Sequence, residues 1–216
     1  MRAFKNIVKA VSGKSSKNKN SSNVRNNEIT TNIVNGIKKV LTYMEIQPML
    51  PKGLYKEPGF AEEIEAIESL IESGKISETY LSTVRSTHSI SMAIINVLAS
   101  HDPIIPQSLY DHFMSPLANL DALIDDLILK SPLFDLVMGH LRMILNNKNI
   151  HINISEIASN IGIHMLRAVE DDIGFDSQSF ESPARIKTFE RILQHYISGK
   201  EESERFFASA NTPNRR

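Results

Sequence analysis

Apolar residues recur at helical spacing along most of this chain, from residue 29 to residue 197. In one segment after another they fall three or four positions apart, which places them on one face of a helix. The first such face consists of Ile29, Ile33, Ile37, Val40 and Leu41. Candidate strands are short and isolated, at residues 103–106 and 150–154. This pattern predicts an all-α domain of packed helices.

Start and stop signals divide the pattern into separate helices. Gly74 is placed to end the second helix, and Ser131 followed by Pro132 is an N-cap with proline at the first helical position. Ser182 and Pro183 repeat that signal before the last helix. We expect a bundle of seven to nine helices at residues 28–198. The segments with the clearest pattern are residues 29–47, 61–73, 88–99, 107–114, 119–129, 132–145, 155–167 and 183–198.

The net charge of −1 conceals an uneven distribution. Residues 1–27 hold seven Lys or Arg and no acidic residue, so the rest of the chain carries 17 basic against 25 acidic side chains, a balance of −8. Residues 12–27 are rich in Ser and Asn, and such a segment buries too little apolar surface to offset the entropy lost on ordering. We expect residues 1–27 and 199–216 to be largely disordered tails.

At the start of the first tail, Phe4, Ile7, Val8 and Val11 share one face of a short helix that lysines flank. A basic amphipathic segment of this kind is typical of an anchor at an anionic membrane surface or of an organelle-targeting peptide. Because so short a helix is marginal in water, a plain tail is the third interpretation. No stretch of the sequence approaches the roughly 20 apolar residues of a membrane-spanning helix. We expect a cytoplasmic protein, with peripheral membrane attachment through residues 1–11 as the alternative.

The sequence offers little for a self-contained active site. It has no cysteine, which excludes disulfides and thiolate chemistry, and none of its seven histidines pairs with a carboxylate at metal-ligand spacing. The acidic run at 171–176 lacks the alternating ligands and the distal glutamate of a calcium loop. Gly53 and Gly59 lack the following Lys-Ser or Lys-Thr of a phosphate-binding loop. We expect no metal, no cofactor and no nucleic-acid partner.

One loop has the composition of a segment with a defined conformation. It reads Gly53-Leu54-Tyr55-Lys56-Glu57-Pro58-Gly59 and joins the first two expected helices. The glycines at its ends permit tight turns, and Pro58 fixes a backbone angle. We expect Tyr55 to pack beneath the loop and Lys56 to be exposed at its centre.

This loop and its surroundings resemble the Rho GTPase-activating (RhoGAP) domain, in which the first helix leads into Gly-Ile-Phe/Tyr-Arg-x-x-Gly. Later motifs of that family are echoed here by His101-Asp102-Pro103-Ile104-Ile105 and Tyr110, by His140-Leu141, and by Ile157-Ala158 through Leu166-Arg167. The resemblance covers residues 29–197. It is strongest to the divergent module of inositol polyphosphate 5-phosphatases, whose loop reads Gly-Leu-Phe-x-x-Pro-Gly and whose next helix opens with a His-Ser pair, as His88-Ser89 does here.

The resemblance implies a surface that docks onto the switch regions of a small GTPase of the Rho or Rac type. In active members the loop arginine neutralises charge on the transferring phosphoryl group and is worth about 10³ to 10⁵ in rate. This chain has Lys56 at that position, and lysine lacks the planar fork of arginine. Three further positions at which active members carry a Lys, an Arg and an Asn align with Ile95, Ala99 and Ser155. The GTPase-binding residues that the resemblance implies are Gly53, Tyr55, Lys56, Glu57, Pro58, Ile95, Ala99 and Ser155.

Three hypotheses about function follow. The first is a RhoGAP-like regulatory module in small-GTPase signal transduction, which binds its GTPase with lost or weak GTPase-activating activity. The second is an active GTPase-activating protein that uses Lys56, or the neighbouring Lys52, as its finger. The third is an interaction scaffold unrelated to GTPases and held at a membrane by residues 1–11. The four changed positions together favour the first.

Overall fold

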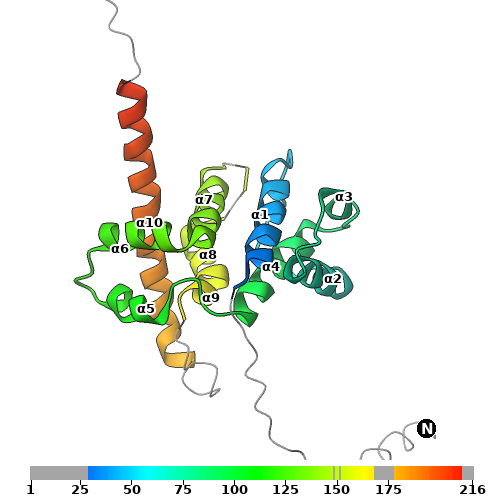
Figure 1. The fold of residues 1–216 in the computed structure, drawn as a ribbon, viewed down its shortest axis with the longest axis horizontal. Helices are drawn as coiled ribbons and strands as arrows, with labels where there is room; N and C mark the ends of the chain where they lie inside the picture. Colours follow the sequence, from blue (N-terminus) through cyan, green and yellow to red (C-terminus); the bar gives the residue numbers. More distant parts are fainter. Residues whose placement is uncertain (1–28, 148, 151, 168–177, 211–216) are drawn as a thin grey trace, which may run out of the picture.

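The computed structural model describes residues 29–147, 149–150, 152–167 and 178–210, and in the last helix it describes the side chains of residues 183–204. These residues form helices and no strand (Figure 1). The elements are α1 Thr31–Glu45, α2 Ala61–Glu72, α3 Glu78–Leu81, α4 Thr87–Ser100, α5 Gln107–Met114, α6 Leu120–Lys130, α7 Pro132–Asn146, α8 Ile154–Ile157, η1 Ala158–Gly162, α9 Ile163–Met165 and α10 Gln178–Ala210. Because α8, η1 and α9 are continuous, the described residues contain nine helices, which confirms the expected all-α fold.

Local signals end several helices where the sequence predicts it. The Ser131 side chain accepts a hydrogen bond from the N–H of Phe134, and Pro132 is the first residue of α7. At the end of α2, Gly74 has a φ of +69° and its N–H donates to the carbonyl oxygen of Ile71 at 2.9 Å. Because glycine adopts this left-handed conformation without strain, it is suited to the residue that terminates a helix.

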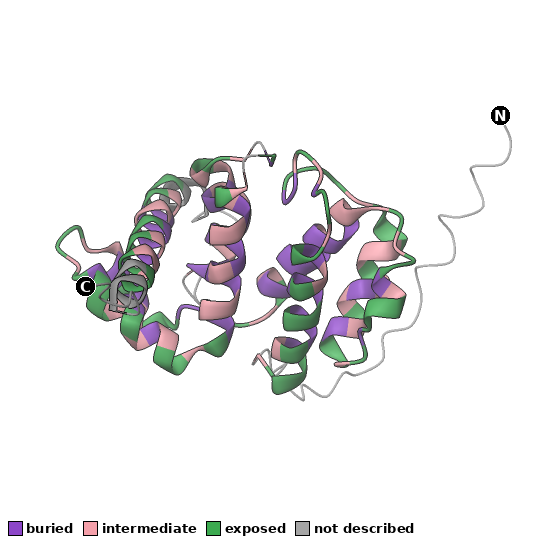
Figure 2. Cartoon of the chain, turned by 90° about the horizontal axis from the view of Figure 1, so that it is seen from above, coloured by how far each residue is buried: buried purple, intermediate pink, exposed green. Residues whose placement is uncertain are grey.

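The helices pack on both sides of a central pair. Helices α1 and α7 are in contact in the middle of the molecule, α2 and α4 pack together on one side of them, and α6 and α10 on the other (Figure 1). Most helices have buried positions on one face and exposed positions on another (Figure 2). A single hydrophobic core joins the two sides and includes Ile37, Ile71, Ile94, Val137 and Leu193, each of them fully buried.

The helix that follows α7 in the chain contains a π-helical segment. A regular helix was expected at residues 155–167, but the structure has a capping box of Asn153 and Glu156 at its start, the segment η1 in its middle and its last residue at Met165. Gly162 ends η1 against α10, where a Cβ atom would lie 2.3 Å from the ring of Phe189. The wider turn and the missing side chain together let α10 approach this helix closely.

Helix α10 begins earlier and ends later than the sequence predicted. It begins five residues before Pro183, which lies inside the helix, and it continues to Ala210, although disorder was expected from Gly199 onward. Two ion pairs connect the helix to α7 near and beyond Gly199: Lys200 with Asp135 at 3.2 Å, and Arg142 with Glu204 at 2.7 Å. An isolated glycine costs a helix about 1 kcal/mol, which contacts to a neighbouring helix can offset.

Some predictions concern parts of the chain outside the described residues. These are the disordered basic tail at residues 1–27 with its amphipathic segment, the acidic run at 171–176, and the end of the C-terminal tail at 211–216. In the part of the chain that the structure describes, no helix combines the length and the apolar character needed to cross a membrane.

Candidate functional site

The loop between α1 and α2 contains a tight turn at residues 53–57. The N–H groups of Lys56 and Glu57 both donate to the carbonyl oxygen of Gly53, at 2.9 and 2.8 Å. Gly53 has a φ of +74°, and Tyr55 has a φ of +65°, a value that side chains rarely permit. A non-glycine residue keeps such a backbone only where its surroundings hold it there. The contacts of the Tyr55 ring and backbone are therefore the basis of the shape of the loop.

Tyr55 fastens the loop to the core. Its side chain is 1% exposed, and its ring meets that of His140 on α7 edge to face, with 6.1 Å between the centroids. The N–H of Tyr55 donates to the Ser91 hydroxyl on α4 at 3.3 Å. Burial, reinforced by the charge of Glu45, raises the pKa of the Tyr55 hydroxyl far above its ordinary value, so the ring is neutral. Tyr55 packs beneath the loop, as expected from its position, and its burial leaves no surface for the GTPase contact that the family resemblance implied for it.

A second attachment holds the other end of the loop. Gly59 lies directly on α4, because a Cβ atom there would be 2.3 Å from the Cα of Ser89. The next residue, Phe60, donates its N–H to the Ser89 hydroxyl at 2.9 Å, and that hydroxyl donates to the carboxylate of Glu63 at 2.7 Å. The loop is thus bonded to two serines that lie on α4, one near each of its ends.

Glu63 completes this second attachment. Burial alone would raise the pKa of its carboxyl. Hydrogen bonds from the backbone N–H of Arg85, the Ser89 hydroxyl and the Arg85 guanidinium lower the pKa by more than burial raises it, so it lies below its ordinary value. The Arg85 guanidinium also covers the ring of Phe60, 4.3 Å from its centroid. Glu63 is therefore a carboxylate at neutral pH that accepts hydrogen bonds from Arg85 and from Ser89.

Lys56 projects from the loop between the two attachments. Its side chain is 61% exposed, and its ammonium nitrogen lies 3.5 Å from the carboxylate of Glu156 on α8. A pocket of about 200 Å³ opens at this point, and its lining includes Gly53, Glu57 and Ile152. The structure thus brings the centre of the loop to the start of α8, which is 100 residues away in the sequence.

The α8 side of this site contains one residue that the sequence predicted and one that it did not. Ser155, which the family resemblance aligned with an asparagine, is exposed in the first turn of α8. Its neighbour Glu156 reaches the loop, and the other carboxylate oxygen of Glu156 accepts a hydrogen bond from the backbone N–H of Asn153 at 3.1 Å. The spacing of Asn153 and Glu156 is that of a capping box, which would have located Glu156 at a helix start but not beside Lys56.

The two other positions that the resemblance singled out, Ile95 and Ala99, lie on α4. Ile95 is one turn beyond Ser91 and is 6% exposed, so it belongs to the core and corrects the expectation that it contacts a partner. Ala99 is half-buried in the last turn of the helix. An aliphatic residue at position 95 is explained by packing, because this face of α4 lies against the hydrophobic core.

Exposed apolar side chains flank the loop on both sides, and the sequence prediction did not single them out. Ile46 is 65% exposed and Met49 81% exposed in the segment that precedes the loop, and Phe60, which follows it, is 48% exposed. A contiguous exposed apolar patch marks a binding site, and these three side chains are neighbours of the loop in the sequence. Met49 lies between Pro48 and Pro51, where no helix face could bury it, whereas no comparable signal in the sequence marked Ile46 and Phe60.

The chemistry available at this site is electrostatic. Lys56 can place one positive charge against an anionic group of a partner, while the loop itself is held by neutral hydrogen bonds from Tyr55 and Phe60. Within the described ranges of the chain, no three His, Asp or Glu side chains gather closely enough to hold a metal ion.

Comparison with known proteins assigns no family to this chain. No protein-family model and no curated protein matches its sequence.

Proposed function

We propose that this chain is a regulatory module that binds a small GTPase of the Rho or Rac type and accelerates GTP hydrolysis weakly or not at all. The observation that carries the proposal is the loop at residues 53–59, which is bonded to α4 near both ends and presents Lys56 to solvent between them. A fixed loop with one exposed cation is suited to reaching into the nucleotide site of a partner, because little ordering remains to be done on binding.

The ion pair of Lys56 with Glu156 does not prevent that movement. An exposed pair of this kind contributes at most about 1 kcal/mol, and salt screens it further. The phosphates of a nucleotide carry more negative charge than one carboxylate and would compete for the ammonium group. The contact with Glu156 is therefore a resting position that Lys56 can leave.

Weak activation follows from the chemistry of lysine. An arginine finger donates two hydrogen bonds from a rigid plane, and the whole finger is worth about 10³ to 10⁵ in rate, or about 4 to 7 kcal/mol. Lysine retains the charge but offers a single compact ammonium group on a flexible stem. The lysine and arginine that active family members carry on the third helix are Ile95 and Ala99 here, which removes further positive charge.

The surroundings of the loop suit a protein partner. Stable interfaces bury about 800 Å² on each side and combine an apolar centre with a polar rim. Ile46, Met49 and Phe60, which precede or follow the loop in the sequence, are exposed apolar side chains, and Lys52 and Glu57 are exposed charged ones. Of these residues, Glu57 is among the positions that the family resemblance implies, and the other four are additional.

Single-turnover GTP hydrolysis by a panel of Rho-type GTPases tests the proposal. The proteins compared are the wild type, Lys56→Ala, Lys56→Arg and, as a matched control, Lys130→Arg, which makes the same change at a similarly exposed lysine on α6. We expect the wild type to accelerate hydrolysis by less than about tenfold and Lys56→Arg to gain about tenfold or more. Lys130→Arg should behave as the wild type does. Binding of each GTPase in its GTP and GDP states is measured separately.

Other outcomes select the alternatives. Wild-type acceleration of about a hundredfold or more that Lys56→Ala abolishes would establish an active GTPase-activating protein with a lysine finger. If no GTPase binds in either nucleotide state, the proposed function is wrong. An interaction scaffold held at a membrane by residues 1–11 would then be tested by liposome binding with and without that segment.

A further inference from the structure

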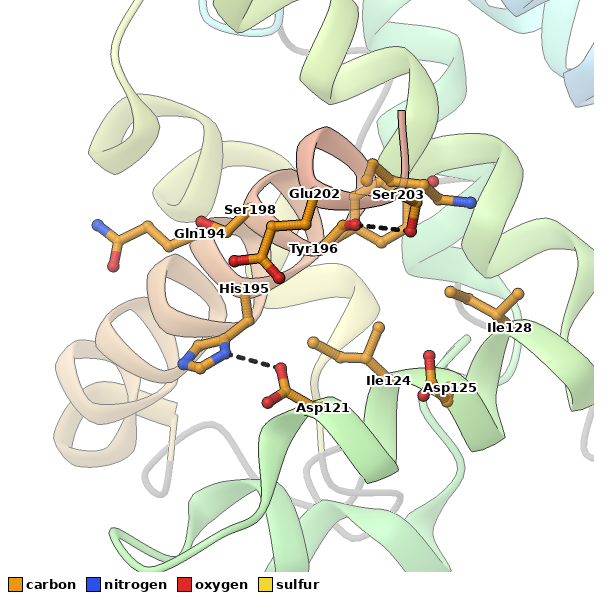
Figure 3. A pocket seen from close by; sticks show the side chains of 12 residues that line it. Asp121, Ile124, Asp125, Ile128, Gln194, His195, Tyr196, Ser198, Glu202 and Ser203 are labelled. Atoms are coloured by element: carbon orange, nitrogen blue, oxygen red, sulfur yellow. Dashed lines mark hydrogen bonds and ion pairs between the residues drawn. The ribbon is translucent and has the colours of Figure 1, made fainter. Parts of the chain in front are cut away.

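A second concave surface lies between α6 and α10, on the side of the molecule away from α2 and α4 (Figure 1). It has a volume of about 630 Å³ and is lined by side chains of both helices (Figure 3). Its floor is formed by the side chains of Ile124, which is 5% exposed, Tyr196, which is 4% exposed, and Ile128, which is partly buried, and the Lys200 ammonium lies 5.3 Å from the centroid of the Tyr196 ring. We call this surface the α6–α10 groove.

The rim of the α6–α10 groove is acidic. Asp121 and Asp125 on α6 and Glu202 on α10 are exposed around the apolar floor (Figure 3). Of the basic groups in the lining, Lys200 is directed to Asp135 on α7 at 3.2 Å, and His195 to Asp121 at 3.1 Å. The groove therefore suits a ligand that is apolar on one face and positively charged beside it.

The chain itself contains such a segment. Residues 1–11 hold Arg2, Lys5 and Lys9 and no acid, while Phe4, Ile7, Val8 and Val11 have the spacing of one helical face. We propose that residues 1–11 bind the α6–α10 groove of their own chain as an amphipathic helix, with the apolar face on Ile124 and Ile128 and the basic residues against the acidic rim. This is a helix-in-groove contact, a recurrent mode of recognition.

The connecting segment is long enough for this contact. Residues 12–28 provide 17 residues, which span about 56 Å when extended and have a root-mean-square length of about 23 Å as a flexible chain. A domain of about 170 residues has a diameter of about 40 Å and a half-circumference of about 63 Å, so the extended linker reaches most of its surface from the start of α1, short of the point directly opposite. Tethering gives the segment an effective concentration of the order of millimolar, at which even weak binding is populated. The inference is independent of the proposed GTPase partner.

Paramagnetic relaxation tests the contact in the full chain. Because the protein has no cysteine, Asn6→Cys places a single nitroxide label on the polar side of the segment, opposite its apolar face. We expect the label to weaken the amide signals of residues 121–128 and 194–203 and to leave those of α2 unchanged. A mixture of labelled protein with isotope-labelled, spin-free protein distinguishes contact within one chain from contact between two copies.

Two sets of variants make the test specific. The double variant Asp125→Lys with Glu202→Lys reverses charge on the rim and should abolish the weakening, while Glu62→Lys with Glu65→Lys, an equal change on the exposed side of α2, should preserve it. Ile7→Ser with Val8→Ser alters only the segment, leaves the bundle intact and should also abolish it. The proposal is overturned if the label does not weaken the groove signals, or weakens them only between two chains. It is also overturned if the α2 control variant loses the weakening equally, or if the weakening survives both the rim and the segment variants. A segment that becomes ordered only on vesicles of anionic lipid would overturn it in favour of a membrane anchor.

Discussion

Replacement of Gly59 by alanine is the sharpest test of how the loop is attached. The new Cβ atom would lie 2.3 Å from the Cα and 2.4 Å from the backbone nitrogen of Ser89, whereas ordinary contacts are 3.4 to 4 Å. These atoms belong to the backbone of α4 and cannot rotate away, so the loop must retreat by about 1 Å. A retreat of that size also breaks the hydrogen bond from Phe60 to the Ser89 hydroxyl, which is 2.9 Å long.

These effects give a magnitude for Gly59→Ala. Overpacking costs about 1 to 3 kcal/mol and the lost hydrogen bond about 1 kcal/mol, while the loss of glycine freedom in the unfolded chain returns about 0.4 to 1 kcal/mol. We expect the free energy of unfolding to fall by about 1 to 3 kcal/mol, or the midpoint temperature by about 2 to 4 °C for each kcal/mol. Urea unfolding followed by far-ultraviolet circular dichroism measures it.

Gly139→Ala is the matched control for this measurement. Gly139 lies inside α7, and a Cβ atom there would be 3.6 Å from the Tyr196 hydroxyl, an ordinary contact. Because alanine favours a helix over glycine by about 1 kcal/mol, this variant should be as stable as the wild type or more so. The reasoning about the attachment is refuted if Gly59→Ala lies within about 0.5 kcal/mol of Gly139→Ala.

Three further predictions concern single contacts. Tyr55→Phe should leave the free energy of unfolding unchanged or raise it by about 1 kcal/mol in urea unfolding, because the buried hydroxyl has no hydrogen-bond partner among the described residues; a loss of about 2 kcal/mol would contradict this. Glu63→Gln should destabilise the protein more at pH 7 than at pH 3, because a carboxyl with a lowered pKa stabilises the fold above its unfolded pKa and loses that contribution as the pH falls through its folded pKa. A stability difference from the wild type that is the same at both pH values would show that the charge of Glu63 is not involved. Gly162→Ala should lower the thermal midpoint, since the added Cβ would lie 2.3 Å from the ring of Phe189, and Phe189→Leu in the same chain should restore part of the loss.

Much of the fold could be predicted from the sequence, because its determinants are local. Apolar spacing and the signals at Gly74 and at Ser131 with Pro132 depend on a few neighbouring residues, and the structure has helix ends at those positions. The extent of α10 could not be predicted in the same way. Its continuation past Gly199 is accompanied by ion pairs to α7 whose partners are about 60 residues distant, and no local pattern reports them.

In the candidate site, too, the features with local determinants could be predicted and those that depend on distant residues could not. The exposure of Lys56 and the burial of Tyr55 followed from a loop with glycines at its ends. The neighbour of Lys56, Glu156, and the buried state of Ile95 depend on how distant helices pack, so alignment to a family motif placed Ile95 on a surface that it does not reach.

The two serine contacts of the loop also bear on how this region opens. The amide hydrogens of Tyr55 and Phe60 are donated to hydroxyls of Ser91 and Ser89, both on α4. Exchange of these hydrogens with solvent therefore requires the loop to separate from that helix. We expect the two amides to exchange at matched rates, because the loop and α4 form one cooperative unit. Lys56 then belongs to a segment that separates from the bundle only when this whole unit opens.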